Sequence, residues 1–376
     1  AGVSAKEPLY EGLGTHTRKV TTDSPDAQRY FNQGLALLHG FNHGAAIRSF
    51  KQAAELDPRC AMAHWGIALA NGPHINLPFV PPPAAEEAWK ELTLAQRNAA
   101  RATPIERELI EALAARYANP QPADRGPLDR AYADAMRKVW QAHPDDADVG
   151  ALFAEALMDL RPWNQWTPDG KPQPGTEEVV ATLEAVLKLD LQHPLANHLT
   201  IHALEASPYP ERAVAAADRL RDLQPGLAHN VHMPSHIDIR NGRWHESIVA
   251  NTKAIAASER FRALAGPATG SLLIYNAHNR HMLAYSAMMT GQQKLAVDHI
   301  QKMVSELPED FVKDFAPFVD AYVAMPYEVL LRFGRWDDVL AAGDHPEYLP
   351  FSRAIRHAAR GVAFAAKNDT AAAKAE

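Results

Sequence analysis

Residues 27–60 read AQRYFNQGLALLHGFNHGAAIRSFKQAAELDPRC, and this stretch decides the fold. An aromatic residue, a glycine and a bulky residue (Tyr30, Gly34 and Leu37) fall on a first helix. Ala46, Phe50 and Ala53 follow on a second helix, which Pro58 ends. Small residues let two helices approach closely, and proline stops a helix because it lacks an N–H donor. The stretch therefore predicts a hairpin of two closely packed helices.

The same pattern recurs along the chain in a frame of about 34 residues, which is the tetratricopeptide period. Later copies include Trp65-Gly66, Ala213 with Pro225, Gly242-Arg243-Trp244, Ala296 with Pro308, and Gly334-Arg335-Trp336. We predict an all-α, right-handed superhelical solenoid of about eight tetratricopeptide-like hairpins over residues 27–350. An N-terminal extension (1–26) precedes it and a C-terminal capping helix (351–376) follows it.

Three long inserts interrupt the predicted turn between the two helices of a hairpin, at 71–83, 118–127 and 161–175. Because they share one position in the repeat, they should gather along one edge of the solenoid. One interpretation is simple length variation in surface turns. The other is a wall around a bound substrate, which His74, Phe79, Trp163 and Trp166 favour.

Composition excludes several functional classes. A net charge of -7 argues against a nucleic-acid binder, which usually has a basic face. No run of about 18 apolar residues predicts a membrane span. One cysteine, Cys60, rules out an internal disulfide framework, and the sequence contains no G-x-S-x-G, phosphate-loop or C-x-x-C motif.

Histidine is frequent, with 18 copies, and it is concentrated on one predicted surface. In the repeat frame, positions 2, 5, 9 and 12 of the first helix line the concave groove. Seven of these twelve positions in the repeats over about 195–290 are histidine, where the overall frequency of 18 in 376 predicts about 0.6. Residues three or four apart return to one face of a helix. The histidines are His198, His202, His229, His232, His236, His278 and His281, joined by Glu205.

Neutral imidazole is the commonest protein ligand for Zn, Cu, Fe and Ni. We therefore predict that these seven histidines and Glu205 bind two or more transition-metal ions. The alternatives are a groove that binds anions, or polar residues that satisfy one another. Glu205 and Tyr285 are the predicted proton-transfer residues. Whether His39, His43 and His74 join the site stays open at this point.

The chain resembles a group of bacterial tetratricopeptide-repeat proteins over most of its length. The segments that carry the resemblance are Phe41-Asn42-His43, His198 to Glu205 (HxxxHxxE), His232 to His236 (HMPSH) and His278 to His281 (HNxH). The resemblance implies the repeat fold and implies that the histidine segments form one set. His74 in GPHIN stands where such proteins would carry asparagine.

These observations predict a metal-dependent oxidoreductase, with copper favoured over iron and zinc, acting with oxygen on a small organic substrate in the groove. The alternatives are a zinc hydrolase, a metal storage or delivery protein, and a scaffold that binds a protein partner in the groove without catalysis. The chain starts Ala1-Gly2-Val3, which is typical of a protein whose signal peptide has been removed. We therefore expect a periplasmic or secreted protein, with the cytoplasm as the alternative.

Overall fold

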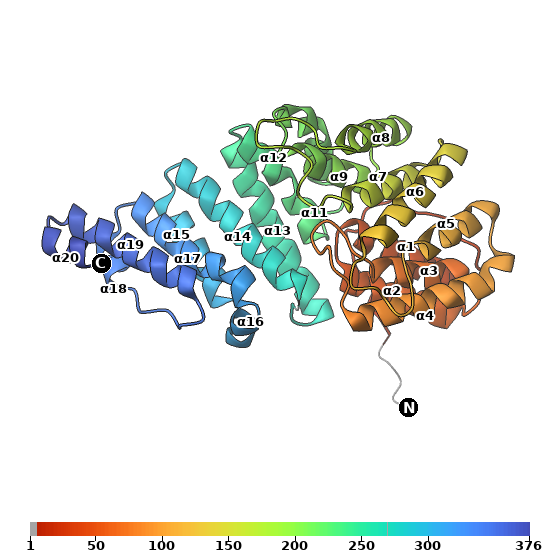
Figure 1. The fold of residues 1–376 in the computed structure, drawn as a ribbon, viewed down its shortest axis with the longest axis horizontal. Helices are drawn as coiled ribbons and strands as arrows, with labels where there is room; N and C mark the ends of the chain where they lie inside the picture. Colours follow the sequence, from red (N-terminus) through yellow and green to blue (C-terminus); the bar gives the residue numbers. More distant parts are fainter. Residues whose placement is uncertain (1–5, 269) are drawn as a thin grey trace. The chain divides into compact units, whose positions relative to one another are not determined.

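The computed structural model describes residues 6–268 and 270–376, and every regular element in these ranges is a helix (Figure 1). The predicted all-α class is confirmed. The chain forms two compact units, the first ending at Asn241 and the second beginning at Gly242. None of the described helices combines the length and hydrophobicity that crossing a membrane requires.

The helices of the first unit fall largely into consecutive pairs. In chain order they are α1 (Pro25–His39), α2 (His43–Leu56), α3 (Ala61–Ala70), α4 (Pro82–Asn98), η1 (Ala99–Arg101), α5 (Pro104–Ala114), α6 (Gly126–Ala142), α7 (Ala147–Met158), α8 (Thr176–Leu189), α9 (Pro194–Leu204), η2 (Pro210–Ala213), α10 (Val214–Leu220), α11 (Ala228–His232) and α12 (Pro234–Arg240).

The second unit is also helical throughout its described residues. Its helices are α13 (Trp244–Ala265), α14 (Ser271–Met289), α15 (Gln293–Ser305), α16 (Glu309–Asp314), α17 (Ala316–Arg332), α18 (Trp336–Ala341), α19 (Pro350–Ala366) and α20 (Thr370–Ala375). Consecutive helices pack on one another here too, including α14 with α15 and α19 with α20.

Hairpins form where the repeat pattern predicts them. In the first unit α1 packs on α2, α3 on α4, α5 on α6, α7 on α8, and α9 on α10. Phe50 shows why the pattern needs glycine: a Cβ atom on Gly34 would lie 2.6 Å from its ring, and one on Gly66 would lie 2.7 Å from it. The Phe50 ring thus fills a gap that two glycines leave open, between its own hairpin and the next. The domain limits 1–26, 27–350 and 351–376 remain predictions.

The first unit departs from an array in which each hairpin meets its neighbours alone. Helix α1 of the first hairpin contacts α9 of the fifth. The inserts also meet: the side-chain amide of Gln121 donates a hydrogen bond to the carbonyl of Val80, with the two atoms 3.1 Å apart. The three inserts lie between α3 and α4, between α5 and α6, and between α7 and α8, as predicted.

An irregular segment before α1, residues 6–23, runs across several hairpins, and we call it the strap. Arg18 pairs with Asp146, at 2.8 Å, on the loop before α7. The carbonyl of Gly12 accepts a hydrogen bond from the amide of Gly226 at 2.8 Å. A Cβ atom on Gly226 would lie 2.2 Å from the carbonyl oxygen of Glu11, so that approach requires glycine. Residues 1–5 of the predicted extension lie outside the described residues.

Candidate metal centre

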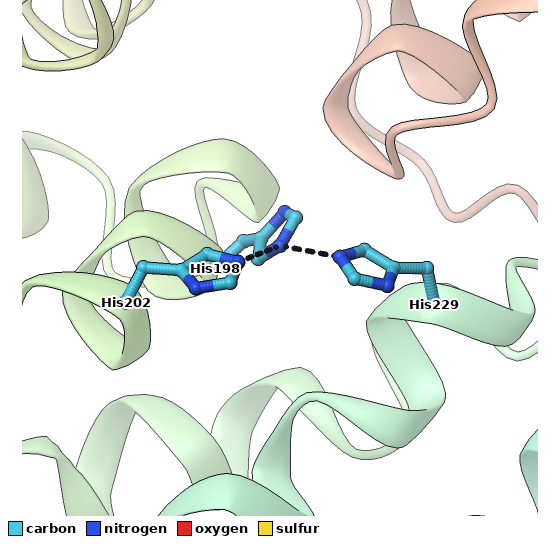
Figure 2. Close-up of side chains that lie close together, drawn as sticks. All are labelled: His198, His202 and His229. Atoms are coloured by element: carbon cyan, nitrogen blue, oxygen red, sulfur yellow. Dashed lines mark hydrogen bonds between the residues drawn. The ribbon is translucent and has the colours of Figure 1, made fainter. Parts of the chain in front are cut away.

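Three imidazole rings converge inside the first unit (Figure 2). His198 and His202 lie one turn apart on α9, and His229 lies on α11. The Nε2 atom of His198 is 3.1 Å from that of His202 and 3.1 Å from that of His229. One ligand atom from each ring lies within 4.8 Å of the others. We call these three residues the triad.

Hydrogen bonds at the opposite ring nitrogens fix the tautomers of two triad residues. Nδ1 of His198 lies 2.9 Å from the carbonyl oxygen of His39, at the end of α1. Nδ1 of His202 lies 3.0 Å from a carboxylate oxygen of Glu205. A carbonyl and a carboxylate can accept but not donate, so both Nδ1 atoms carry the proton. In the neutral rings both Nε2 atoms therefore present lone pairs.

Burial keeps the triad neutral. It lowers the pKa of His198 and of His229 well below the usual value of 6.5. Burial also lowers the pKa of His202, although Glu205 partly opposes this effect. Since neutral imidazole is the form that binds metal, all three rings are ready to act as ligands at neutral pH.

The contact between Nε2 of His198 and Nε2 of His202 brings two lone pairs to 3.1 Å. A proton on Nε2 of His229 can be donated to Nε2 of His198, which satisfies the contact between these two residues. The contact between His198 and His202 stays repulsive. A cation between the rings would remove the repulsion, and the lowered pKa values disfavour a proton in that role. Two nitrogens about 2.0 Å from a tetrahedral ion lie about 3.3 Å apart, close to the observed spacing. The arrangement fits a metal ion.

A second pair of histidines lies beside the triad. Nε2 of His232 is 2.9 Å from Nε2 of His236, and Nδ1 of His236 donates to the second oxygen of Glu205 at 2.5 Å. One carboxylate thus holds His202 and His236 together. Burial alone would raise the pKa of Glu205, but its electrostatic interaction with His236 and the hydrogen bonds from both histidines outweigh burial and hold that pKa far below its usual value.

The HMPSH segment does not form one uninterrupted helix, although the spacing of its histidines assumes one. Helix α11 ends at His232 and α12 begins at Pro234. Proline has no N–H to donate to a helical hydrogen bond, and its ring clashes with the carbonyl group of the residue four positions earlier. Met233 between them keeps helical dihedral angles, with φ -51° and ψ -38°. His232 and His236 therefore still return to one side.

The triad is buried, whereas the repeat register predicts that these positions line an open groove. Phe41, in the turn after α1, covers them: its ring centroid lies 4.4 Å from that of His198 and 5.4 Å from that of His229. Phe41 has a φ of 53°, a left-handed conformation that an aromatic residue rarely adopts. The contact of α1 with α9, which sequence periodicity cannot show, closes this part of the groove.

The remaining predicted site residues lie on α14 of the second unit. The rings of His278 and His281 have centroids 6.4 Å apart. Burial lowers the pKa of His281 to about 4. Tyr285 packs against Trp244 with the ring centroids 6.0 Å apart. Their assignment to the metal site, and the roles of Glu205 and Tyr285 in proton transfer, remain predictions.

The histidines left open by the sequence surround the triad instead of joining it. His39 contributes its backbone carbonyl. His43 and His74 stack on each other, with centroids 3.9 Å apart, and both contact Phe41. In the sequence, His43 belongs to the FNH segment and His74 to the GPHIN segment. Nothing in the sequence identified the carbonyl of His39, since every residue has one.

A further cluster of possible ligands joins His16 of the strap, Asp148 and His193. Nε2 of His16 and Nε2 of His193 lie 2.8 and 3.1 Å from the same oxygen of Asp148. Nδ1 of His193 accepts a hydrogen bond from the amide of Ala196, so its proton is on Nε2 and points at the carboxylate. This tautomer favours a hydrogen bond from His193 to Asp148 over a metal site, whereas in the triad the Nε2 atoms of His198 and His202 carry lone pairs.

Comparisons with known proteins add little. No protein-family model and no curated protein sequence matches the chain. Among solved structures, an IFIT1 monomeric mutant with Gppp-AAAA is similar over 95% of this chain and 90% of that one, at 11% identity and a TM-score of 0.35.

Two other solved structures are similar at the same low level. A signal transduction ATPase with numerous domains and a tetratricopeptide repeat sensor, from Pyrococcus horikoshii, is 11% identical with a TM-score of 0.45. The match covers 93% of this chain and 50% of that one. The APC/C hetero-tetramer Cut9–Hcn1 gives 14% identity and a TM-score of 0.37, over 92% of this chain and 71% of that one. The fold assignment rests on the helix pairing described above.

Proposed function

We propose that this protein binds a transition-metal ion through the Nε2 atoms of the triad, His198, His202 and His229. The observation that carries the proposal is the pair of Nε2 lone pairs 3.1 Å apart, each fixed by a hydrogen bond at Nδ1. Metal-bound histidines usually donate their other N–H to a carbonyl or carboxylate, because this orients the ring and raises its basicity. In the triad, His198 donates to the carbonyl of His39 and His202 donates to the carboxylate of Glu205.

We further propose that His232 and His236 hold a second ion beside the first. Glu205 accepts a hydrogen bond from one histidine of each pair, which supports binding at the two places as a coupled event. Imidazole ligands suit copper, iron and zinc, and copper binds most tightly in the divalent series. Copper is therefore the metal we propose first, with iron and zinc as the alternatives.

We propose that the metal carries out oxygen-linked redox chemistry on a small organic substrate. We also propose that the protein is exported from the cytoplasm. Three histidines leave one position of a tetrahedral ion open, which is the arrangement of catalytic sites, whereas structural sites are closed. Burial of the triad speaks against a groove in which these histidines grip a peptide. Zinc-dependent hydrolysis, and metal storage or delivery, are the competing uses.

The FNH, HxxxHxxE and HMPSH segments all contribute residues to this centre or its cover. This supports grouping the chain with the bacterial tetratricopeptide-repeat proteins that share these segments. The HNxH segment, His278 to His281, lies on α14 of the second unit.

Metal analysis of the purified protein tests the proposal. Wild-type protein, His198→Ala, His202→Ala and the control His245→Ala, an exposed residue on α13, should be purified side by side. We expect bound metal in wild type and in the control, and a sharp loss in both triad variants. X-ray absorption should then show nitrogen ligands at about 2.0 Å. Metal-free wild type that also fails to bind added Cu(I), Fe(II) or Zn(II) would remove the proposal. Oxygen uptake by loaded protein separates catalysis from storage.

A further inference from the structure

A small cavity adjoins the candidate metal centre on the side of the inserts. Its walls include Ile75 from the insert 71–83, Met158 at the end of α7, Trp163 from the insert 161–175, and His202. It offers about 20 Å³ to the centre of a water-sized molecule, which is room for about one water. Because His202 belongs to both the cavity and the triad, the cavity shares one wall with the triad.

Trp163 closes this cavity toward the solvent. Its ring stands edge-on to that of His202, with centroids 5.1 Å apart and an interplanar angle of 87°. The residue as a whole is 55% exposed, so one side of the indole faces solvent while the other covers a metal ligand. Its φ of 60° is left-handed, a strained conformation for a bulky side chain. Such strain persists where the surroundings fix it, and it is concentrated at functional sites.

The polar side chains of the cavity are already engaged with protein atoms. Gln165 donates to the carbonyl of Arg161 at 3.0 Å and accepts from the hydroxyl of Thr176 at 3.1 Å. Both oxygens of Glu205 accept hydrogen bonds from histidines. The walls therefore attract a guest through apolar contact, and the negative charge of Glu205 repels anions. A molecule held here would take its affinity from the metal ion.

We infer that a triad-bound ion turns its open coordination position to this cavity, where it takes up a small uncharged molecule of the dioxygen class, and that Trp163 sets the size limit. The inference rests on the proposed function, since the triad supplies the ion. It extends that function by naming the kind of molecule admitted and the residue that selects it. Trp163 is a specificity-determining residue in this arrangement, because its side chain lines the cavity that would hold the small molecule and does not bind the ion.

The test compares two uncharged ligands of Cu(I) that differ in size, carbon monoxide and tert-butyl isocyanide. Wild type, Trp163→Gly, Trp163→Asn and the control Phe79→Ala are loaded with Cu(I) without oxygen, and binding is followed by infrared spectroscopy. Glycine and asparagine both tolerate a positive φ, so these variants should keep the fold, which circular dichroism checks. Phe79 is a matched control because it is an aromatic residue, 58% exposed, on the neighbouring insert, outside these walls.

We expect carbon monoxide to bind all four proteins with similar affinity. The isocyanide should bind both Trp163 variants at least about tenfold more tightly than it binds wild type or the control, a difference of about 1.4 kcal/mol. Equal isocyanide affinity in wild type and in the Trp163 variants would overturn the inference, as would a Cu(I)-loaded wild type that binds no carbon monoxide. A wild type that retains no Cu(I) would instead overturn copper as the proposed metal, and one that retains it equally well after His202→Ala would overturn the triad as its binding site.

Discussion

Glu205 offers no nitrogen to the proposed ion, yet it holds one histidine of each pair by the Nδ1 proton. We predict that Glu205→Gln weakens metal binding by about 10- to 100-fold, the usual cost of losing such a carboxylate. The amide keeps the size of the side chain but loses the charge and one acceptor. Competition with a chromophoric chelator measures the affinity. Replacing the half-buried Glu246 on α13 with glutamine should change nothing, and an equal loss there would point to a general effect of charge.

At the scale of single residues, sequence spacing grouped the histidines with Glu205, but it could not show the backbone carbonyl that supports His198. Residues 198, 202 and 205 fall on one helical face by periodicity alone. The carbonyl of His39 has no sequence signature, and it reaches His198 across 159 residues of chain. Trp163 was visible as an aromatic residue within an insert, but its ring contact with His202 depends on a backbone conformation that tryptophan rarely adopts.

Between elements, Gly34 and Gly66 both approach the ring of Phe50 closely. We predict that Gly34→Ala destabilises the protein by about 1–3 kcal/mol, because the added methyl overpacks the contact between α1 and α2. Higher helix propensity of alanine would offset about 1 kcal/mol of this cost. The midpoint of denaturation in urea measures the net effect.

Gly44 provides the matched control within the same hairpin. A Cβ atom there would meet Arg48 no closer than 3.9 Å, at the far end of a flexible side chain. Gly44→Ala should therefore leave stability unchanged or raise it by up to about 1 kcal/mol. If the two substitutions have the same effect, the packing account of the repeat is wrong.

The helices themselves were largely predictable, because small and large residues recur at fixed positions in the repeat. The three inserts were located for the same reason, as breaks in that recurrence. The division between α11 and α12 shows where periodicity is insufficient. Histidines at 229, 232 and 236 match one helical face, and Pro234 between them ends the regular hydrogen bonding without changing that face.

For the molecule as a whole, metal binding should tighten a restricted region. An ion held by the triad joins α9 to α11, and through His198 it also involves the end of α1. Because a ligand that binds the native arrangement alone stabilises it by mass action, we predict slower hydrogen exchange in residues 194–240 on adding Cu(I). Helices α17 to α20 should change far less. Exchange mass spectrometry with and without a chelator measures this, and a uniform change along the chain would contradict the triad as the site.

The strap should be held in a pH-dependent way through His16. Burial would lower the pKa of His16, but the hydrogen bond to Asp148 and the charges of Asp148 and Asp190 outweigh burial and Arg18, and raise it above 6.5. The neighbouring rings of His39 and His193 complete its surroundings. A raised pKa contributes stability that is present below pH 6.5 and is lost as pH rises through the folded value.

The pKa of Asp148 is shifted in the opposite direction to that of His16. Burial would raise its pKa, but the hydrogen bonds from His16 and His193 hold it well below 3.8, so its contribution is lost only in acid. We therefore expect residues 6–23 to be best protected between about pH 4 and 6.5. Exchange at pH 5.5 and 8.5, corrected for intrinsic rates, should show faster opening of the strap at the higher pH. His16→Gln should abolish that difference, and a difference that survives would exclude His16 as its cause.

The strap also affects how the first unit unfolds. An array whose hairpins touch their neighbours alone can fray from either end, one hairpin at a time, since no contact spans the interior. Here Arg18 reaches the fourth hairpin and Gly12 reaches the loop before α11, while α1 already meets α9. Losing the first hairpin would break these distant contacts together. The first unit should thus unfold as one cooperative block, with a single transition and a denaturant slope close to that of a globular domain of its length.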